Sequence, residues 1–130
     1  MATTHRSILL IEDDSGIRDT VAECLASEGY EVAPVENGRE ALSWLRNTSR
    51  RNTARPDLIM VDLVMPVMNG AQFIEELRGD ASLRDIPIVL MTAASPSSAM
   101  PLPRADAYLA KPFDLGALLD TVERHCTAAA

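Results

Sequence analysis

Five polar residues in this sequence are placed where they could act together on a phosphate group. Each lies in or next to a short apolar run. Asp13 and Asp14 come after "SILLI", Asp62 lies inside "LIMVDLVMP", Thr92 ends "IVLMT" and Lys111 follows "AYLA". Carboxylates are ligands for hard cations such as Mg²⁺, and a lysine ammonium is a natural partner for phosphate. These groups are what phosphoryl transfer requires, because its catalysis is mostly positioning and neutralisation of charge.

Asp62 needs an explanation of its own, since it is a carboxylate within an otherwise apolar run. Burying a carboxylate without a partner is strongly unfavourable. Grouping it with Asp13 and Asp14 adds repulsion of about 4 kcal/mol for each pair that lies ~4 Å apart at an effective dielectric near 20. A divalent cation and the ammonium of Lys111 would remove this penalty. The pattern therefore favours Asp62 as a nucleophile that faces a metal ion and a lysine.

The elements that must position these residues alternate along the chain. Apolar runs of strand length alternate with segments of helical period, which predicts right-handed βαβ units and a parallel sheet covered on both faces. In a sheet of order 2-1-3-4-5 the polar residues would meet beyond the carboxyl ends of the strands, where open α/β sheets bind ligands. Strands are expected at 7–11, 30–36, 57–63, 86–93 and 107–110, and helices at 15–29, 37–46, 69–79 and 114–126.

Local signals refine these boundaries. Ser15 is the expected N-cap of the first helix and Gly29 its stop. Pro34 suits an edge strand because proline cannot donate to a ladder. The segment 95–106 contains three prolines, and a proline inside a helix costs ~3 kcal/mol, so this crossover is expected to be short, irregular and mobile. The segment 46–56, with four arginines, is expected to be a solvated loop.

Composition narrows the classes of function. The chain has 130 residues, with 12 basic and 19 acidic residues and a net charge of -7. This charge argues against nucleic acid as a direct partner, since such binding depends on Lys and Arg neutralising phosphates. No apolar run approaches the ~20 residues of a membrane span, and no secretory signal follows "MATTHRS". A cytoplasmic protein without membrane insertion is expected.

Four motifs, "LLIEDD", "MVDLVMPVMNG", "VLMTA" and "YLAKPF", stand in this order. In order and spacing they closely resemble the receiver domain of two-component response regulators, of the chemotaxis-regulator type, from about Ser7 to His125. The resemblance implies a flavodoxin-like, doubly wound five-stranded sheet and a single receiver domain over 1–130, with its core at about 7–126. It also implies a signalling switch in which Asp62 accepts a phosphoryl group from the phosphohistidine of a sensor histidine kinase or phosphotransfer protein.

Such a switch is not a turnover enzyme, because it catalyses only its own phosphorylation and dephosphorylation. Its modification would change the affinity for a downstream protein or output domain, neither of which the sequence identifies. For the metal, the resemblance implies Mg²⁺ or Mn²⁺ bound directly by Asp14 and Asp62, through a water by Asp13, and by the backbone carbonyl of Val64. Glu12 is not expected to be a ligand, since at strand period it points away from Asp13.

The resemblance also assigns residues around the phosphoryl group. Thr92 would donate a hydrogen bond to it and move towards it, and Lys111 would pair with one of its oxygens. The peptide bond from Lys111 to Pro112 would be cis, which a bond to proline permits at modest cost. Tyr108 would be the aromatic residue that rotates inward on activation.

The sequence departs from the family in two respects. Thr92 and Lys111 are separated by 19 positions, a few fewer than usual, and the proline-rich segment stands where the fourth helix normally lies. The second departure concerns Val64 and Ala94, which follow the acceptor and the threonine by two positions. Neither side chain can orient a hydrolytic water, so slow self-dephosphorylation is expected.

Three other functions are weighed against this one. A hydrolase of the haloacid dehalogenase type needs a second Asp two positions after the nucleophile as its general acid, and that position is Val64. A flavin- or nucleotide-binding module needs a glycine-rich turn after the first strand, where this chain has the anionic "EDDSGI". A receiver-like interaction module that works without phosphorylation stays open, because the fourth crossover is abnormal.

Overall fold

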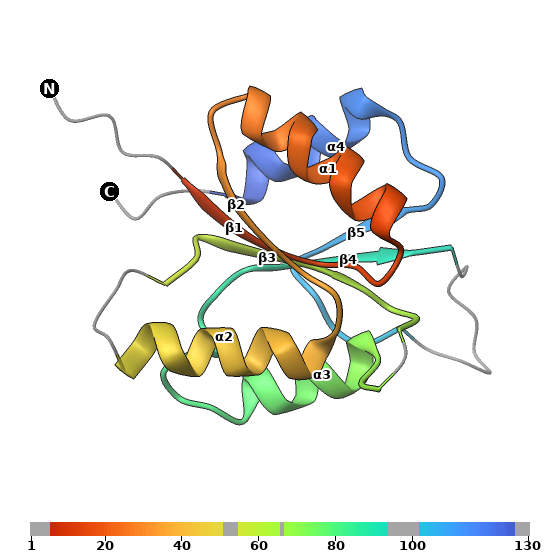
Figure 1. The fold of residues 1–130 in the computed structure, drawn as a ribbon. Coiled ribbons are helices and arrows are strands. Elements are labelled where there is room, and N and C mark those ends of the chain that lie inside the picture. The colour runs from red at the N-terminus through yellow and green to blue at the C-terminus, as the bar shows by residue number, and fades with distance from the viewer. Residues whose placement is uncertain (1–5, 51–54, 66, 94–101, 127–130) are drawn as a thin grey trace, which may run out of the picture.

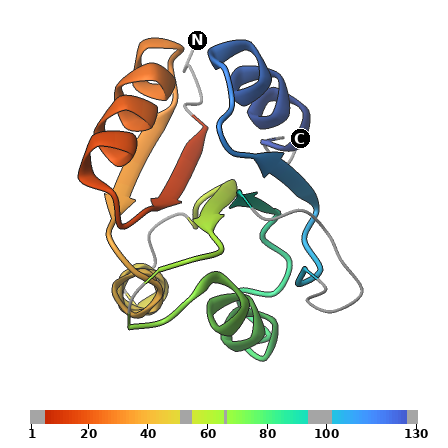
Figure 2. The ribbon, with the colours of Figure 1, turned by 90° about the vertical axis from the view of Figure 1, so that its right-hand side faces the viewer.

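A five-stranded parallel sheet lies between two pairs of helices (Figure 1). The structure is a computed structural model that describes residues 6–50, 55–65, 67–93 and 102–126. Helices α1 and α4 cover one face of the sheet and α2 and α3 cover the other (Figure 2). The elements in chain order are β1 Ser7–Ile11, α1 Ser15–Ser27, β2 Glu31–Val35, α2 Gly38–Arg50, β3 Leu58–Asp62, α3 Gly70–Arg78, β4 Ile88–Thr92, β5 Ala107–Ala110 and α4 Leu115–His125.

The strand order is β2-β1-β3-β4-β5, and every neighbouring pair is parallel, as predicted. Strand β2 is therefore an edge strand, which accommodates Pro34. Strands β3 and β4 are buried along their whole length because helices cover both of their faces. All five strands run in one direction, so their carboxyl ends meet at a single edge of the sheet.

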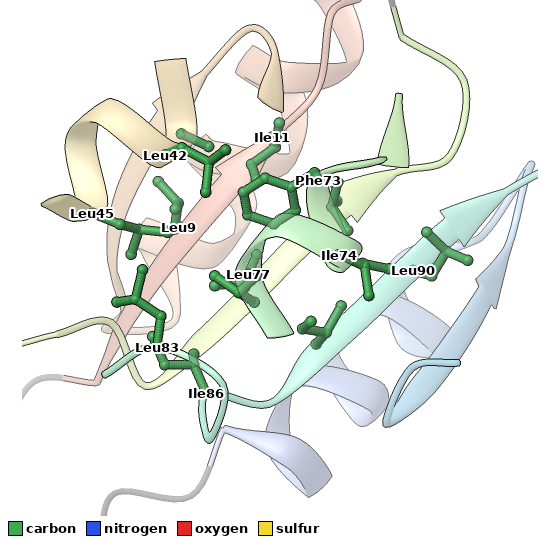
Figure 3. Packing of buried hydrophobic residues seen from close by; sticks show 14 of the residues in the cluster. Leu9, Ile11, Leu42, Leu45, Phe73, Ile74, Leu77, Leu83, Ile86 and Leu90 are labelled. Carbon is green, nitrogen blue, oxygen red and sulfur yellow. The ribbon is translucent and has the colours of Figure 1, made fainter. Parts of the chain in front are cut away.

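The core consists of two clusters, one on each face of the sheet. Alternate residues of a strand point to opposite faces, so Leu9 and Ile11 of β1 pack against α2 and α3, whereas Ile8 and Leu10 pack towards α1 and α4. Figure 3 shows the first of these clusters, in which Phe73 lies close to Ile11 beneath the carboxyl end of β1. This two-sided burial fixes the strand ends that carry the polar residues.

The N-cap of helix α1 lies one residue earlier than predicted. Asp14 is its N-cap, with Oδ1 accepting a hydrogen bond from the amide of Ile17 at 3.0 Å, and Ser15 is the first helical residue. The predicted stop at Gly29 is confirmed, since this glycine has φ +96. The amide of Tyr30 then donates to the Leu25 carbonyl at 3.2 Å, which closes the helix end.

Helix α2 is longer than the apolar pattern indicates. It continues to Arg50, so the loop predicted from residue 46 is wrong for 46–50. No glycine or proline stands between Gly38 and Arg50, so helical hydrogen bonding continues past the last apolar residue. Residues 51–54 of that predicted loop lie outside the described residues.

The crossover from β4 to β5 is described from residue 102 onward, while 94–101 lie outside the described residues. Residues 102–106 form no helix, as predicted. Asp106 anchors this stretch to the sheet: its amide donates to the Ile88 carbonyl at 3.0 Å and its Oδ2 accepts from the Ile88 amide at 2.7 Å. Leu102 and Ala105 pack against the core.

Within the described part of the chain, none of the helices combines the length and the apolar character that a membrane span requires.

Candidate functional site

Backbone hydrogen bonds carry the sheet ladder one residue past the ends of three strands. The amide of Glu12 donates to the Val35 carbonyl at 3.1 Å, and the amide of Lys111 donates to the Thr92 carbonyl at 2.8 Å. Leu63, directly after β3, is held in the same way by the Met91 carbonyl at 2.9 Å. These three residues are therefore held by the sheet itself, which favours a preorganised site.

Three carboxylates and one ammonium meet there. Glu12, Asp13 and Asp62 each offer a carboxylate oxygen, and these oxygens lie within 4.8 Å of one another. Lys111 Nζ donates to Glu12 Oε1 at 2.7 Å and to Asp62 Oδ2 at 3.0 Å. Glu12 is 1% exposed and Asp62 6% exposed, whereas Asp13 faces solvent. Asp13, Asp62 and Lys111, which were expected to meet beyond the carboxyl ends of the strands, do lie at this one edge of the sheet.

The charges in this cluster perturb one another. Burial raises the pKa of Glu12 to about 7, and the neighbouring Asp62 carboxylate adds to the rise, while the hydrogen bond from Lys111 opposes it. Burial by itself would lower the pKa of Lys111, but its hydrogen bonds to Glu12 and Asp62 outweigh that effect and keep the pKa above its usual value. The ammonium is thus held in its charged form between two carboxylates.

The two acidic residues that join Asp62 in the cluster are Glu12 and Asp13, one position earlier than the expected pair Asp13 and Asp14. Asp14 lies outside the cluster, because its carboxylate caps α1, and its amide donates to Glu12 Oε2 at 3.2 Å. Glu12 does not point away from the site, as strand alternation would have it. The register pairing of β1 ends at Ile11 and the chain bends at Asp13, so strand alternation does not direct the side chains of Glu12 and Asp13 to opposite faces. A glutamate side chain is also long enough to reach Lys111 from the strand end.

The loop after β3 is packed tightly against the start of α3. The amide of Gly70 donates to the Leu63 carbonyl at 2.9 Å. A Cβ atom at Gly70 would lie 2.6 Å from the Asp62 carbonyl oxygen and 2.8 Å from Leu63 Cα. Only glycine lets α3 begin this close to the backbone of Asp62. The amide of Val64 donates to Asp62 Oδ1 at 3.4 Å, while its side chain is 75% exposed.

Thr92 and Tyr108 occupy neighbouring strands. Thr92 is buried at the end of β4, and its Cα pairs in register with Ala110 of β5. Tyr108 is 48% exposed, and its hydroxyl donates to the Pro103 carbonyl at 2.9 Å and accepts from the Ala105 amide at 3.1 Å. The tyrosine hydroxyl is therefore bonded to the crossover segment. The Lys111–Pro112 peptide bond is cis, as predicted.

Sequence reasoning missed three residues that shape the site: Glu12, Gly70 and Arg18. Arg18 of α1 donates from Nη1 to the backbone carbonyl of Glu12 at 2.9 Å. The signal for Glu12 was present, since it directly follows the first apolar run. Nothing in the sequence shows that Arg18 turns back to the strand end, or that Gly70 touches the backbone of Asp62.

The chain is an α/β protein with a doubly wound parallel sheet, and an acidic cluster and a lysine meet at the carboxyl edge of that sheet. The sequence profile of the response regulator receiver domain matches residues 8–123. The chain therefore belongs to the family of response regulator receiver domains, which are signalling domains of two-component systems.

Known relatives agree with this assignment. The chain is 34% identical over 116 residues to the DNA-binding response regulator MtrA of Mycobacterium tuberculosis, covering 87% of this chain and 47% of that protein. It thus spans about half the length of the curated relatives it matches.

Solved structures give the same fold. The chemotaxis protein CheY4 of Vibrio cholerae shares 32% identity with a TM-score of 0.79, over 94% of this chain and 99% of that one. The receiver domain of the sensor histidine kinase PA1611 from Pseudomonas aeruginosa shares 29% identity with a TM-score of 0.79, over 96% of this chain and 100% of that one. That structure holds a magnesium ion in its active-site cleft.

Proposed function

We propose that this chain is a single receiver domain that works as a phosphorylation-controlled switch, with Asp62 as the phosphoacceptor. The observation that carries the proposal is the contact between the Lys111 ammonium and the buried carboxylate of Asp62, at 3.0 Å within an acidic cluster. A half-buried cation beside a carboxylate is suited to neutralise a phosphoryl group that this carboxylate receives. The donor is the phosphohistidine of a sensor histidine kinase or phosphotransfer protein.

The donor set fits Mg²⁺ or Mn²⁺. Asp13 and Asp62 supply two carboxylates with oxygens close enough to share one small hard cation. The backbone carbonyl of Val64 is the third protein ligand that the family resemblance implies. Glu12 has both oxygens bonded already, to Lys111 and to the Asp14 amide, so its role is to hold Lys111. When bound, the cation supplies positive charge against the oxygens of the incoming phosphoryl group.

The transfer follows from the placement of the chain's own residues. An oxygen of Asp62 bonds to phosphorus as the bond from phosphorus to the donor's imidazole nitrogen breaks, which leaves an acyl phosphate on Asp62 and a free histidine on the donor. Lys111 pairs with one phosphoryl oxygen, and the hydroxyl of Thr92 donates to another. Because Thr92 ends β4, Lys111 directly follows the neighbouring β5, and a backbone hydrogen bond of 2.8 Å joins them, they respond to the phosphoryl group together.

Partners are proposed from the surface beside the site. An open, mostly apolar groove of about 670 Å³ runs between α1 and the segment after β5, lined in part by Ile17, Val21, Pro112 and Phe113. It borders Lys111 and supports docking of the protein that donates the phosphoryl group. The output lies in a downstream protein or an output domain, as the DNA-binding relatives suggest. The net charge of -7 supports no direct nucleic-acid contact by this domain.

Slow loss of the phosphoryl group is part of the proposal. The side chain of Val64 is exposed beside Asp62 but is apolar, so it cannot orient a water for attack on the acyl phosphate. Ala94, the other residue in this prediction, lies outside the described residues. Replacing Val64 by Gln should shorten the lifetime of phosphorylated Asp62, measured by mass spectrometry over time. A lifetime of seconds in the wild-type protein would contradict the proposal.

Intact-mass spectrometry after incubation with acetyl phosphate tests the acceptor directly. We expect one added phosphoryl group in the wild-type protein, dependent on Mg²⁺, and none in Asp62→Asn. Asp85→Asn is the matched control, because Asp85 is an exposed aspartate outside the cluster, and it should be phosphorylated like the wild type. A protein that binds Mg²⁺ but gains no phosphoryl group from acetyl phosphate or from a kinase would favour a module that acts without phosphorylation.

A further inference from the structure

Arg18 makes a contact that the proposed chemistry does not use. It is half-buried on α1, and its guanidinium turns back to the end of β1, where Nη1 donates to the Glu12 carbonyl at 2.9 Å. This carbonyl lies beyond Ile11, the last residue of β1 that is paired in register. Within the described residues Arg18 forms no salt bridge, although three carboxylates lie near the end of that strand. Its donors are directed at the backbone instead.

The Glu12 carbonyl belongs to the peptide group that joins Glu12 to Asp13. A peptide group is planar and links its carbonyl rigidly to the Cα atoms of both residues, so a hydrogen bond that restrains the carbonyl also restrains the positions of these two Cα atoms. Two of the three carboxylates in the cluster extend from those Cα atoms. One hydrogen bond from Arg18 therefore limits where both side chains begin.

The following residue is held to the same helix. The Asp14 carbonyl accepts the backbone amide of Arg18 at 2.8 Å, and the Asp14 carboxylate accepts the amide of Ile17 at 3.0 Å. The short turn from Glu12 to Asp14 is thus bonded to α1 at both of its ends. Asp13, which lies between them and faces solvent, has its backbone position set by this frame.

We propose that Arg18 is a positioning residue for the metal site: by holding the peptide group between Glu12 and Asp13, it keeps Asp13 where it can share one Mg²⁺ with Asp62. The inference rests on the proposed function, which requires Mg²⁺ at these carboxylates. In this role Arg18 would act through the peptide group that it contacts and not as a ligand of the cation. Groups that orient metal ligands without touching the metal commonly change its affinity by about ten- to a hundredfold.

The sign of the effect separates positioning from charge. If Arg18 acted only as a positive charge near the cluster, its removal would strengthen Mg²⁺ binding, because repulsion of the cation would fall. If Arg18 positions Asp13, its removal weakens binding. Arg18→Met removes the charge and the donors but keeps an unbranched apolar stem in place of the arginine methylenes. Arg18→Lys keeps the charge and loses the planar guanidinium, so any weakening in that variant has no origin in net charge.

The experiment is an NMR titration of the amide signals of Asp13 and Leu63 with MgCl₂, without phosphoryl donor. Arg124→Met is the control, because it removes one positive charge from an exposed pair with Asp120 at the far end of α4. Thermal unfolding, measured separately, shows that each variant is folded at the titration temperature. We expect about tenfold weaker Mg²⁺ binding in Arg18→Met, a smaller weakening in Arg18→Lys and wild-type binding in the control.

Each outcome is decisive. Weaker binding by folded Arg18→Met, with an unchanged control, supports the inference, and weaker binding by Arg18→Lys does so even if the methionine variant fails to fold. Binding by Arg18→Met that equals or exceeds the wild type would overturn it and leave the proposed function intact. A wild-type protein without saturable Mg²⁺ binding would refute the metal site itself, and this inference with it.

Discussion

Replacing Glu12 by Gln should make the metal-free protein more stable at neutral and alkaline pH. Glu12 is fully buried, and burial together with Asp62 raises its pKa from 4.5 to about 7 in the folded state. A folded-state pKa above the unfolded value means that the folded protein loses stability when the group ionises, so stability is greatest below the unfolded pKa and falls as pH rises through the folded pKa. Fully ionised, Glu12 lowers the free energy of unfolding by about 3 kcal/mol.

The magnitude can be followed through a pH series. Between pH 5 and pH 8 the wild-type protein should lose about 2 to 3 kcal/mol relative to Glu12→Gln, because over most of this window Glu12 is ionised in the unfolded chain but still protonated in the folded protein. The glutamine removes the charge, and its carbonyl oxygen can still accept from Lys111 at the position of Oε1. Its amide nitrogen cannot accept the bond that the Asp14 amide donates to Oε2, a loss that is the same at every pH and leaves the pH-dependent difference unchanged. Urea unfolding of both proteins in EDTA, followed by circular dichroism, gives the difference at each pH.

The control is Glu23→Gln, which removes one carboxylate from the exposed surface of α1. Its stability should run parallel to that of the wild type over the same pH range. Parallel curves for Glu12→Gln as well would refute the reasoning from burial. A Glu12→Gln protein that is less stable than the wild type at pH 8 would show instead that the ion pair with Lys111 outweighs the cost of burying both charges.

Three further predictions test other parts of the structure, the first two by urea unfolding. Val67 has φ +71, a strained backbone conformation for a β-branched residue, and its side chain is 70% exposed. Val67→Gly should therefore raise the free energy of unfolding by about 1 kcal/mol, whereas the control Val64→Gly should not raise it. Gly70→Ala should lower it by about 2 kcal/mol, because the new methyl group collides with the backbone at the end of β3. Tyr108→Phe removes the hydroxyl that accepts the Ala105 amide, so hydrogen exchange at that amide should rise about fivefold.

Most of the fold follows from short-range patterns. The strands are short, mostly apolar runs of four or five residues that alternate with segments of helical period, and this alternation leaves few topologies besides a parallel sheet. Asp62 and Lys111 could be placed at one edge because carboxyl ends of parallel strands share it. The end of α2 was predicted less well, because the apolar face stops before the helix does.

The arrangement within the site was harder to predict, because it depends on where the strand pleat stops. The prediction extended strand alternation to Glu12 and so turned its side chain away from the site. The register pairing of β1, however, ends at Ile11. Aspartate and serine are both good N-caps, so propensity alone could not choose between Asp14 and Ser15. Contacts that reach across the fold, such as that of Arg18 with Glu12, have no local pattern and become visible only in three dimensions.

The burial of Glu12 in the acidic cluster underlies both the stability prediction for Glu12→Gln and the expected affinity of the site for a cation. The fold brings three carboxylates within 4.8 Å and buries two of them, an arrangement that lowers its own stability when no cation is bound. Among the described residues Lys111 is the cation that contacts them, and it contacts two carboxylates at once. One positive charge therefore cannot neutralise the cluster, and the remaining negative charge favours binding of a second cation. Glu12→Gln should accordingly gain stability and lose Mg²⁺ affinity together, because the same repulsion determines both.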